Sequence, residues 1–224
     1  MIRNLLLISN STLHGSGYLD HCESQIREIL GDRKKVLFVP YARPSGKTWQ
    51  EYTNIARERF QKAGFDLTGI HELRLLSYEA IKDTEAIFIG GGNTFVLLRQ
   101  LQDEGIIEAI EQRVRNGAPY IGTSAGANVA GRTIMATNDM PIVRPSSFKA
   151  MALVPFNINP HYLDPDPNSR HMGETRETRI KEYHVFNDDV VVGLREGAMI
   201  HVVGDKIYLK GSTGVRIFRR GQEP

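Results

Sequence analysis

The chain has 224 residues, of which 41% are hydrophobic and 24% charged, and its formal net charge is +2. These values are typical of a soluble globular protein, and we expect one domain spanning residues 1–224. The weak charge and the lack of a long basic run argue against nucleic acid as a partner. No apolar stretch approaches the roughly 20 residues of a membrane helix, and the first one is too short for a signal peptide. The single cysteine, Cys22, allows no intramolecular disulfide and fits the reducing cytoplasm.

Short apolar runs bounded by glycine or proline predict buried strands at residues 5–9, 36–39, 86–89 and 118–121. Because these runs have no polar face, the strands are expected to be covered on both sides, as in a parallel sheet. Longer amphipathic or capped segments predict helices over 48–63, 94–101, 105–116 and 125–135. The alternation of the two predicts an α/β fold with a doubly wound, mostly parallel sheet flanked by helices.

The last quarter of the chain has a different pattern. Residues 199–203 and 206–209 flank Gly204-Asp205, which predicts an antiparallel hairpin added at the edge of the sheet. Between the two regions, residues 146–179 are rich in proline and asparagine and show little periodicity. Long irregular segments in a compact domain are often functional, so we expect part of a site there.

The pentapeptide Gly122-Thr123-Ser124-Ala125-Gly126 lies between a predicted strand and a predicted helix. In this context G-x-S-x-G indicates a nucleophile elbow, a sharp turn that exposes the serine hydroxyl. Glycines at both ends avoid a Cβ clash, and the Ala125 amide at the helix start can stabilise an oxyanion. The alternative interpretation is a glycine-rich turn with Ser124 as the N-cap of the helix.

A serine nucleophile needs a base, and His161 has the best position among the histidines. It follows an apolar run, and Pro160 favours an extended approach to it. His184 and His201 lie in apolar patterns, which favour structural roles. Two carboxylates could orient the base: Glu196 directly follows the predicted strand at 190–195, and Asp139 lies in a loop after the helix of the nucleophile.

Gly91, Gly92 and Asn93 stand between a predicted strand and a predicted helix. Their backbone amides could supply a second oxyanion donor or bind a phosphate. The stretch matches neither the dinucleotide fingerprint nor the P-loop. Neither H-E-x-x-H nor paired cysteines occur, so no metal and no cofactor are expected.

Six stretches stand out together. They are SNSTL at 9–13, IGGGNTF at 89–95, GTSAGAN at 122–128, TNDMPIV at 137–143, NPH at 159–161 and GETRE at 173–177. In order from the first strand towards the C-terminal hairpin, they resemble the peptidase E family of α-aspartyl dipeptidases. The resemblance implies a cytoplasmic serine peptidase that removes an N-terminal aspartate from Asp-Xaa dipeptides.

Carried over residue by residue, Ser124 matches the nucleophile of that family and His161 its base. Asp139 and Glu196 each match an acid proposed for the family. We favour Glu196, because a residue that follows a strand lies on rigid scaffold. Asp139 would then shape its loop or contact the substrate amine. Thr123 departs from the family, which often has tryptophan there, so the wall of the pocket differs.

An aspartyl substrate brings a carboxylate and an ammonium group. Arg176 and Arg179 are natural partners for the carboxylate, because a guanidinium can bind it through two hydrogen bonds. Glu174 could bind the ammonium group. The alternative is a solvated helix face on which these residues pair with one another.

Two other functions remain open on the sequence. One is a cyanophycinase-like peptidase that acts on β-aspartyl bonds, and the other is a non-catalytic module that binds anions at 90–93. A glutamine amidotransferase is disfavoured, because such enzymes have cysteine at the elbow and Cys22 lies far upstream. The chain is expected to be a monomer or a small homo-oligomer.

Overall fold

The computed structural model describes residues 3–43, 45–73, 77–170 and 172–224. The strands are β1 (Asn4–Ile8), β2 (Lys35–Val39), β3 (Asp66–Gly69), β4 (Ile87–Ile89), β5 (Tyr120–Thr123), β6 (Asn157–Tyr162), β7 (Val191–Arg195), β8 (Ala198–Val203), β9 (Lys206–Gly211) and β10 (Val215–Phe218). The helices are α1 (Glu23–Leu30), α2 (Trp49–Lys62), α3 (Ser77–Lys82), α4 (Thr94–Asp103), α5 (Ile107–Arg115), α6 (Ala125–Asn128) and α7 (Arg176–Phe186), with short 3-10 turns η1 (Asp20–Cys22) and η2 (Ile70–Glu72). Within the described ranges no helix combines the length and apolar character needed to cross a membrane.

Seven strands form the larger sheet, in the order β3-β2-β4-β5-β1-β8-β9. The first five of these strands are parallel, β8 is antiparallel to β1, and β9 is antiparallel to β8. This arrangement confirms the predicted α/β fold with a mostly parallel sheet and a C-terminal hairpin at its edge. Because the parallel strands share one direction, β1, β4 and β5 end at the same side of the sheet.

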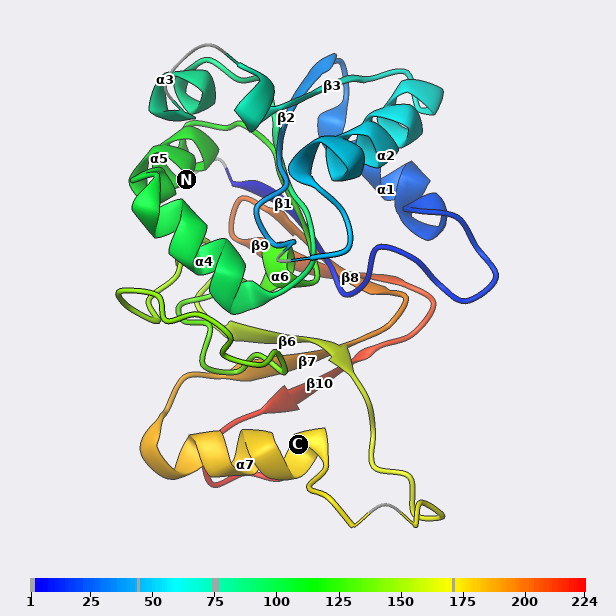
Figure 1. The fold of residues 1–224 in the computed structure, drawn as a ribbon. Helices are drawn as coiled ribbons and strands as arrows, with labels where there is room; N and C mark the ends of the chain where they lie inside the picture. Colours follow the sequence, from blue (N-terminus) through cyan, green and yellow to red (C-terminus); the bar gives the residue numbers. More distant parts are fainter. Residues whose placement is uncertain (1–2, 44, 74–76, 171) are drawn as a thin grey trace.

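Alternate residues of each strand enter two different hydrophobic clusters, as the period of two requires. Leu6 and Ile8 of β1 belong to the cluster that includes residues of α1 and α2. Leu5 and Leu7 belong to the cluster that includes residues of α4 and α5. Figure 1 shows α1 and α2 on one face of the sheet and α3, α4 and α5 on the other. The strands are therefore covered on both faces, which is why they lack a polar face.

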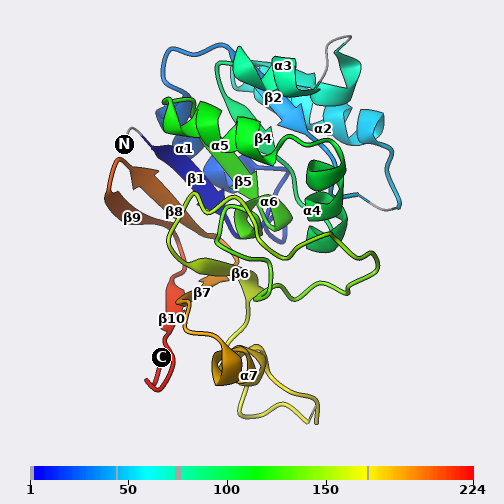
Figure 2. The same ribbon diagram turned by 90° about the vertical axis from the view of Figure 1, so that its left-hand side faces the viewer.

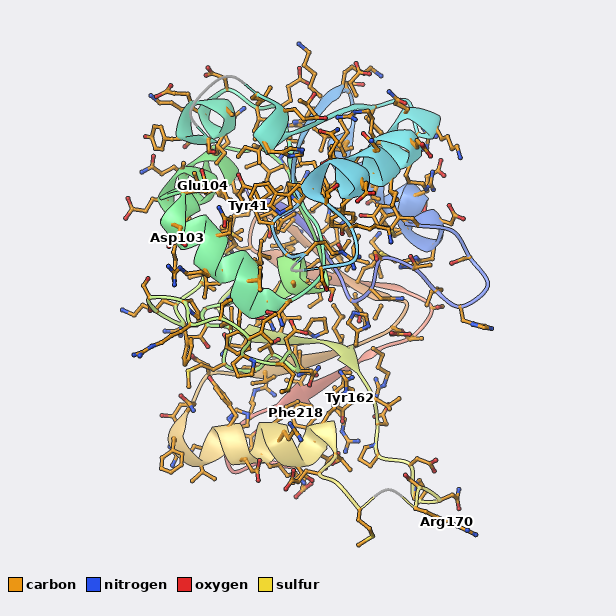
Figure 3. All side chains as sticks on the ribbon, viewed as in Figure 1. Tyr41, Asp103, Glu104, Tyr162, Arg170 and Phe218 are labelled. Carbon is orange, nitrogen blue, oxygen red and sulfur yellow. The ribbon has the colours of Figure 1, made fainter. Side chains whose placement is uncertain are left out.

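A second sheet of three strands, in the order β10-β7-β6, was not expected from the sequence. Figure 2 shows it below the larger sheet, with α7 on its far side. On the α7 side, the rings of Tyr162 and Phe218 lie with centroids 5.6 Å apart, and both are labelled in Figure 3. On the other side, Ile158 and Leu194 join the same hydrophobic cluster as Leu5 and Leu7.

Two further predictions about local structure were wrong. The helix predicted over 125–135 ends at Asn128, because the chain then turns to pair with a later segment: Met151 donates to the Val129 carbonyl and Ala150 to the Arg132 carbonyl. The supposedly irregular segment 146–179 contains β6 and the start of α7. In both places, contacts with distant parts of the chain overrode the local pattern.

Candidate active site

Ser124 is the residue between β5 and α6, at the side of the sheet where the parallel strands end. Its backbone has φ +51° and ψ −110°, an unusual conformation for a residue with a Cβ atom. The Ser124 amide donates to the Ile8 carbonyl at 2.9 Å, and its carbonyl accepts from the Asn128 amide at 2.9 Å. These two bonds hold Ser124 to β1 on one side and to α6 on the other, so the strained residue is fixed from both sides.

The glycines of the pentapeptide are required by close backbone approaches. A Cβ atom on Gly122 would lie 2.4 Å from the Gly126 carbonyl oxygen, and one on Gly126 would lie 2.2 Å from the Ile89 carbonyl oxygen. Real Cβ atoms essentially never approach so closely, and here the obstacle is backbone that cannot move aside. The turn is therefore specific for glycine at both positions.

The apolar run before His161 predicts a residue just past the end of a strand, but His161 lies within β6. Pro160 pairs with Leu194 and Tyr162 with Arg195, so His161 is an extra residue in the ladder between β6 and β7. Its φ of +53° belongs to the left-handed region. A β-bulge of this kind redirects a side chain, and β6 tolerates Pro160 because it is an edge strand.

The imidazole of His161 connects Ser124 and Glu196. Its Nε2 atom lies 3.0 Å from the Ser124 Oγ atom, and its Nδ1 atom lies 2.7 Å from Oε1 of Glu196. Because a carboxylate only accepts hydrogen bonds, we assign the ring proton to Nδ1, which leaves Nε2 free to accept from the serine hydroxyl. Glu196 directly follows β7, and its carbonyl accepts from the Thr213 hydroxyl at 2.7 Å.

Asp139 lies against the start of α4 and makes no contact with the imidazole. Its Oδ2 atom accepts hydrogen bonds from the Thr94 amide at 2.7 Å and from the Thr94 hydroxyl at 2.6 Å. A carboxylate at a helix N-terminus is favoured by the helix dipole. Both ring nitrogens of His161 are already occupied by Ser124 and Glu196, so the geometry leaves no position for Asp139 on the imidazole.

The backbone amides next to Ser124 differ in their availability. The Gly91 amide donates to the Tyr52 hydroxyl at 2.9 Å, and the Asn93 amide donates to the Ala42 carbonyl at 2.7 Å. In the described part of the chain, no hydrogen bond is assigned to the amides of Gly92 and Ala125. Two of the predicted oxyanion donors are thus occupied and two are free.

Tyr52 was not recognised from the sequence as a residue of this region. It lies on α2 and is almost fully buried, and its hydroxyl reaches the Gly91 amide. A Cβ atom on Gly91 would lie 3.0 Å from the Ser124 Cβ atom, so this loop packs against the serine. The sequence offered no signal that Tyr52 binds the Gly91 amide, because the residue fits the apolar face of its helix.

Arg176 lies close to the His161–Glu196 pair. It is the first residue of α7, and its Nη1 atom donates to the Pro160 carbonyl at 3.3 Å. Burial lowers the pKa of the guanidinium, while the carboxylates of Glu196 and Asp139 act in the opposite direction. The residue lines a pocket of about 440 Å³ together with His161, Tyr162, Leu163, Asp164, Arg195 and Glu196.

Arg179 and Glu174, the two other charged residues predicted to bind the substrate, are not part of this pocket. Arg179 pairs with Glu174, with Nη2 and Oε2 3.7 Å apart, and both side chains are more than half exposed. Among the predicted cationic side chains, the structure therefore brings Arg176 to the catalytic candidates and places Arg179 on the surface.

Ser124, His161 and Glu196 are thus in hydrogen-bond contact, an arrangement that is typical of serine hydrolases. The model of Peptidase family S51 matches residues 5–210, and the chain belongs to that family.

Two curated relatives are similar over nearly their whole length. A protein of Drosophila melanogaster named "Probable alpha-aspartyl dipeptidase" is 47% identical over 97% of this chain and 90% of its own. The Peptidase E of Streptomyces coelicolor is 48% identical over 99% of this chain and 89% of its own. Among solved structures, a peptidase from an acI-B1 Actinobacterium matches with a TM-score of 0.74 and 18% identity, covering 99% of this chain and 96% of the other. That last similarity supports the fold alone.

Proposed function

We propose that the chain is a serine dipeptidase that hydrolyses the peptide bond after an N-terminal aspartate. One observation carries the proposal: hydrogen bonds run from Ser124 through His161 to Glu196, over 3.0 and 2.7 Å. Such a chain activates a serine because the imidazole takes the hydroxyl proton and the carboxylate fixes the imidazole tautomer. The name of the Drosophila relative supports the substrate class, and the name of the Streptomyces relative supports a peptidase.

In the proposed reaction, the Ser124 hydroxyl oxygen attacks the carbonyl carbon of the aspartyl residue, and its proton passes to Nε2 of His161. The tetrahedral intermediate places its negative oxygen against the free amides of Gly92 and Ala125. His161 then gives the proton to the leaving amine, and an acyl-enzyme remains on Ser124. Water attacks that ester while His161 accepts its proton. The bond between the acyl carbon and the Ser124 Oγ atom then breaks as His161 returns the proton to Oγ, which releases aspartate and restores the serine.

Arg176 is our candidate for reading the aspartyl carboxylate. A guanidinium has five N–H donors, of which the described contact with the Pro160 carbonyl uses one, so others remain for a carboxylate. Its half-buried position strengthens a charge-assisted hydrogen bond relative to one made in open water. The roles assigned to Arg179 and Glu174 stay predictions, and the ion pair between them offers no support.

The domain organisation, the location and the oligomeric state of the chain are also proposals. One hydrophobic cluster takes residues from both sheets, which supports a single domain over residues 1–224. The cytoplasmic location and the monomeric or small oligomeric state stay predictions.

The test of the nucleophile is Ser124→Ala, assayed by release of leucine from Asp-Leu. We expect kcat to fall by roughly 10³-fold or more, as removal of a triad member does, with an unchanged circular dichroism spectrum. Ser24→Ala is the matched control, because Ser24 is an exposed serine on α1. More than about a tenth of the wild-type turnover in Ser124→Ala would refute the assignment.

Two further measurements separate the proposal from its alternatives. Faster hydrolysis of the β-linked isomer than of Asp-Leu would favour a β-aspartyl peptidase. A serine-directed fluorophosphonate should modify Ser124 in the wild-type protein. Failure of that reaction, together with no hydrolysis of either isomer, would favour a module that binds anions without catalysis.

A further inference from the structure

Two polar side chains at the end of β1 are fully buried and have no part in the proposed chemistry. Ser9 is 0% exposed and Asn10 is 1% exposed. Buried polar groups in folded proteins are almost always hydrogen-bonded, so the partners of such groups show what they stabilise. In the sequence, these residues begin the SNSTL stretch, whose role the proposed reaction leaves unexplained.

Ser9 fills the gap that the bulge at His161 opens between β6 and β7. Its Oγ atom accepts a hydrogen bond from the His161 amide at 2.9 Å and donates one to the Leu194 carbonyl at 2.7 Å. In a regular ladder an amide of one strand would donate directly to a carbonyl of the next. Here the serine hydroxyl stands between the two groups and satisfies both of them.

This contact bears on the direction of the imidazole. The left-handed φ of +53° at His161 is costly for a residue with a Cβ atom, and it persists only where the surroundings impose it. Without the Ser9 hydroxyl, the His161 amide would gain by closing directly on the Leu194 carbonyl. That movement would straighten the bulge and turn Nε2 away from the Ser124 Oγ atom.

Asn10 makes an equivalent contact beside the acid. Its Oδ1 atom accepts from the amide of Gly197, the residue after Glu196, at 2.8 Å. Its Nδ2 atom donates to the Thr12 carbonyl at 2.9 Å, which fixes the orientation of the side-chain amide. Gly197 has a φ of +83°, so the turn that carries Glu196 depends on a backbone conformation that Asn10 stabilises.

The Ser9 contact joins the two sheets, and the Asn10 contact fixes the turn between β7 of the smaller sheet and β8 of the larger one. The nucleophile belongs to the larger sheet, where the Ser124 amide donates to Ile8, the residue before Ser9. His161 belongs to β6 of the smaller sheet, and Glu196 directly follows β7 of that sheet. We propose that Ser9 and Asn10 are positioning residues, which set the base and the acid of the smaller sheet against the serine of the larger one. This inference rests on the proposed function.

The first test is Ser9→Ala, assayed with Asp-Leu well below the unfolding temperature of the variant. We expect kcat to fall about 10- to 100-fold while KM changes less than about threefold, because substrate contacts remain. The rate of Ser124 modification by diisopropyl fluorophosphate should fall in parallel, since it depends on the same base. Thr84→Val is the matched control: it removes a hydroxyl that donates to the Ala86 carbonyl at 2.9 Å, before β4 begins. Its kcat and modification rate should equal those of the wild type.

The second test is Asn10→Ala. We expect the same pattern with a smaller fall in kcat, about 5- to 30-fold, because the backbone beside Glu196 shifts while the carboxylate itself remains. A purely structural role would lower the unfolding temperature of either variant without changing the modification rate of the folded protein.

The outcomes are distinguishable from those that test the proposed function. If the wild type neither hydrolyses Asp-Leu nor reacts with the fluorophosphate, the proposed function fails and this inference fails with it. If the wild type does both, and folded Ser9→Ala and Asn10→Ala keep kcat and modification rate within about twofold, only the positioning role is refuted. Should Ser9→Ala not fold, Ser9→Cys decides, because its thiol is similar in shape but a weak hydrogen-bonding group. An unchanged kcat in Ser9→Cys would then refute the role of Ser9.

Discussion

The choice between Glu196 and Asp139 as the orienting acid leads to the sharpest prediction. The perturbation is Glu196→Gln, which keeps the size of the side chain and removes its charge. A glutamine amide can donate as well as accept, so Nδ1 of His161 is no longer required to carry the proton. In the tautomer in which Nδ1 carries no proton, Nε2 is protonated and cannot take the proton of the Ser124 hydroxyl.

The structure bounds the size of the effect. In a deeply buried triad, replacing the acid with its amide lowers kcat by about 10⁴-fold. Here the Glu196 and His161 side chains are 56% and 39% exposed, so solvent screens part of their interaction. A hydrogen bond to a charged group contributes about 1.5–3 kcal/mol. We therefore expect kcat to fall roughly 100-fold, which corresponds to ~2.7 kcal/mol.

Asp139→Asn is the matched comparison. Its remaining side-chain oxygen can still accept from Thr94, so the variant loses mainly the favourable charge at the start of α4, worth about 0.3–1 kcal/mol of stability. We expect a slightly lower unfolding temperature and a fall in kcat of less than about fivefold. Steady-state kinetics with Asp-Leu for both variants provides the measurement. A larger loss of kcat in Asp139→Asn than in Glu196→Gln would refute the reasoning and transfer the role to Asp139.

Two further predictions concern specificity and acid stability. If Arg176 binds the aspartyl carboxylate, Asp-Leu should exceed Asn-Leu by roughly 100-fold in kcat/KM, from ~3 kcal/mol of charge-assisted bonding. Arg176→Ala should reduce this ratio below about tenfold, whereas Arg179→Ala should preserve it; equal ratios in both variants would place recognition elsewhere. Hydrogen bonds from Arg195 lower the pKa of Asp164 from its ordinary value of 3.8, and Arg216 acts in the same direction. The stabilisation is therefore complete above that value and is lost as the pH falls through the lowered pKa. In urea unfolding, Asp164→Asn should be less stable than the wild type at pH 7, and the difference should shrink below about pH 4; a constant difference would contradict this.

Much of the larger sheet could be predicted because its determinants are local. Continuous apolar runs at 36–39 and 86–89 can be buried only on both faces, and they became β2 and β4. Thr48 and Asn93 cap α2 and α4 through their own side chains, so the starts of these helices were readable from a few residues. The G-x-S-x-G turn is local only in part: Gly122 is required by the Gly126 carbonyl within the turn, whereas Gly126 is required by the Ile89 carbonyl of β4.

The rest depended on contacts between distant residues. The second sheet pairs β6 with β7, about 30 residues later, and the sequence of neither strand indicates which strand it pairs with. On the local sequence both Asp139 and Glu196 are plausible acids, and only the position of Glu196 after a predicted strand favours it. The imidazole contacts Glu196 and not Asp139 because of the bulge at His161. That bulge is held by the hydroxyl of Ser9, 152 residues earlier in the chain. The residue types that the chemistry requires were thus visible in the sequence, whereas their hydrogen-bond partners were decided by the tertiary structure. A hydrogen bond depends on atomic positions within a few ångströms, and the local pattern of a chain specifies no such distance between remote segments.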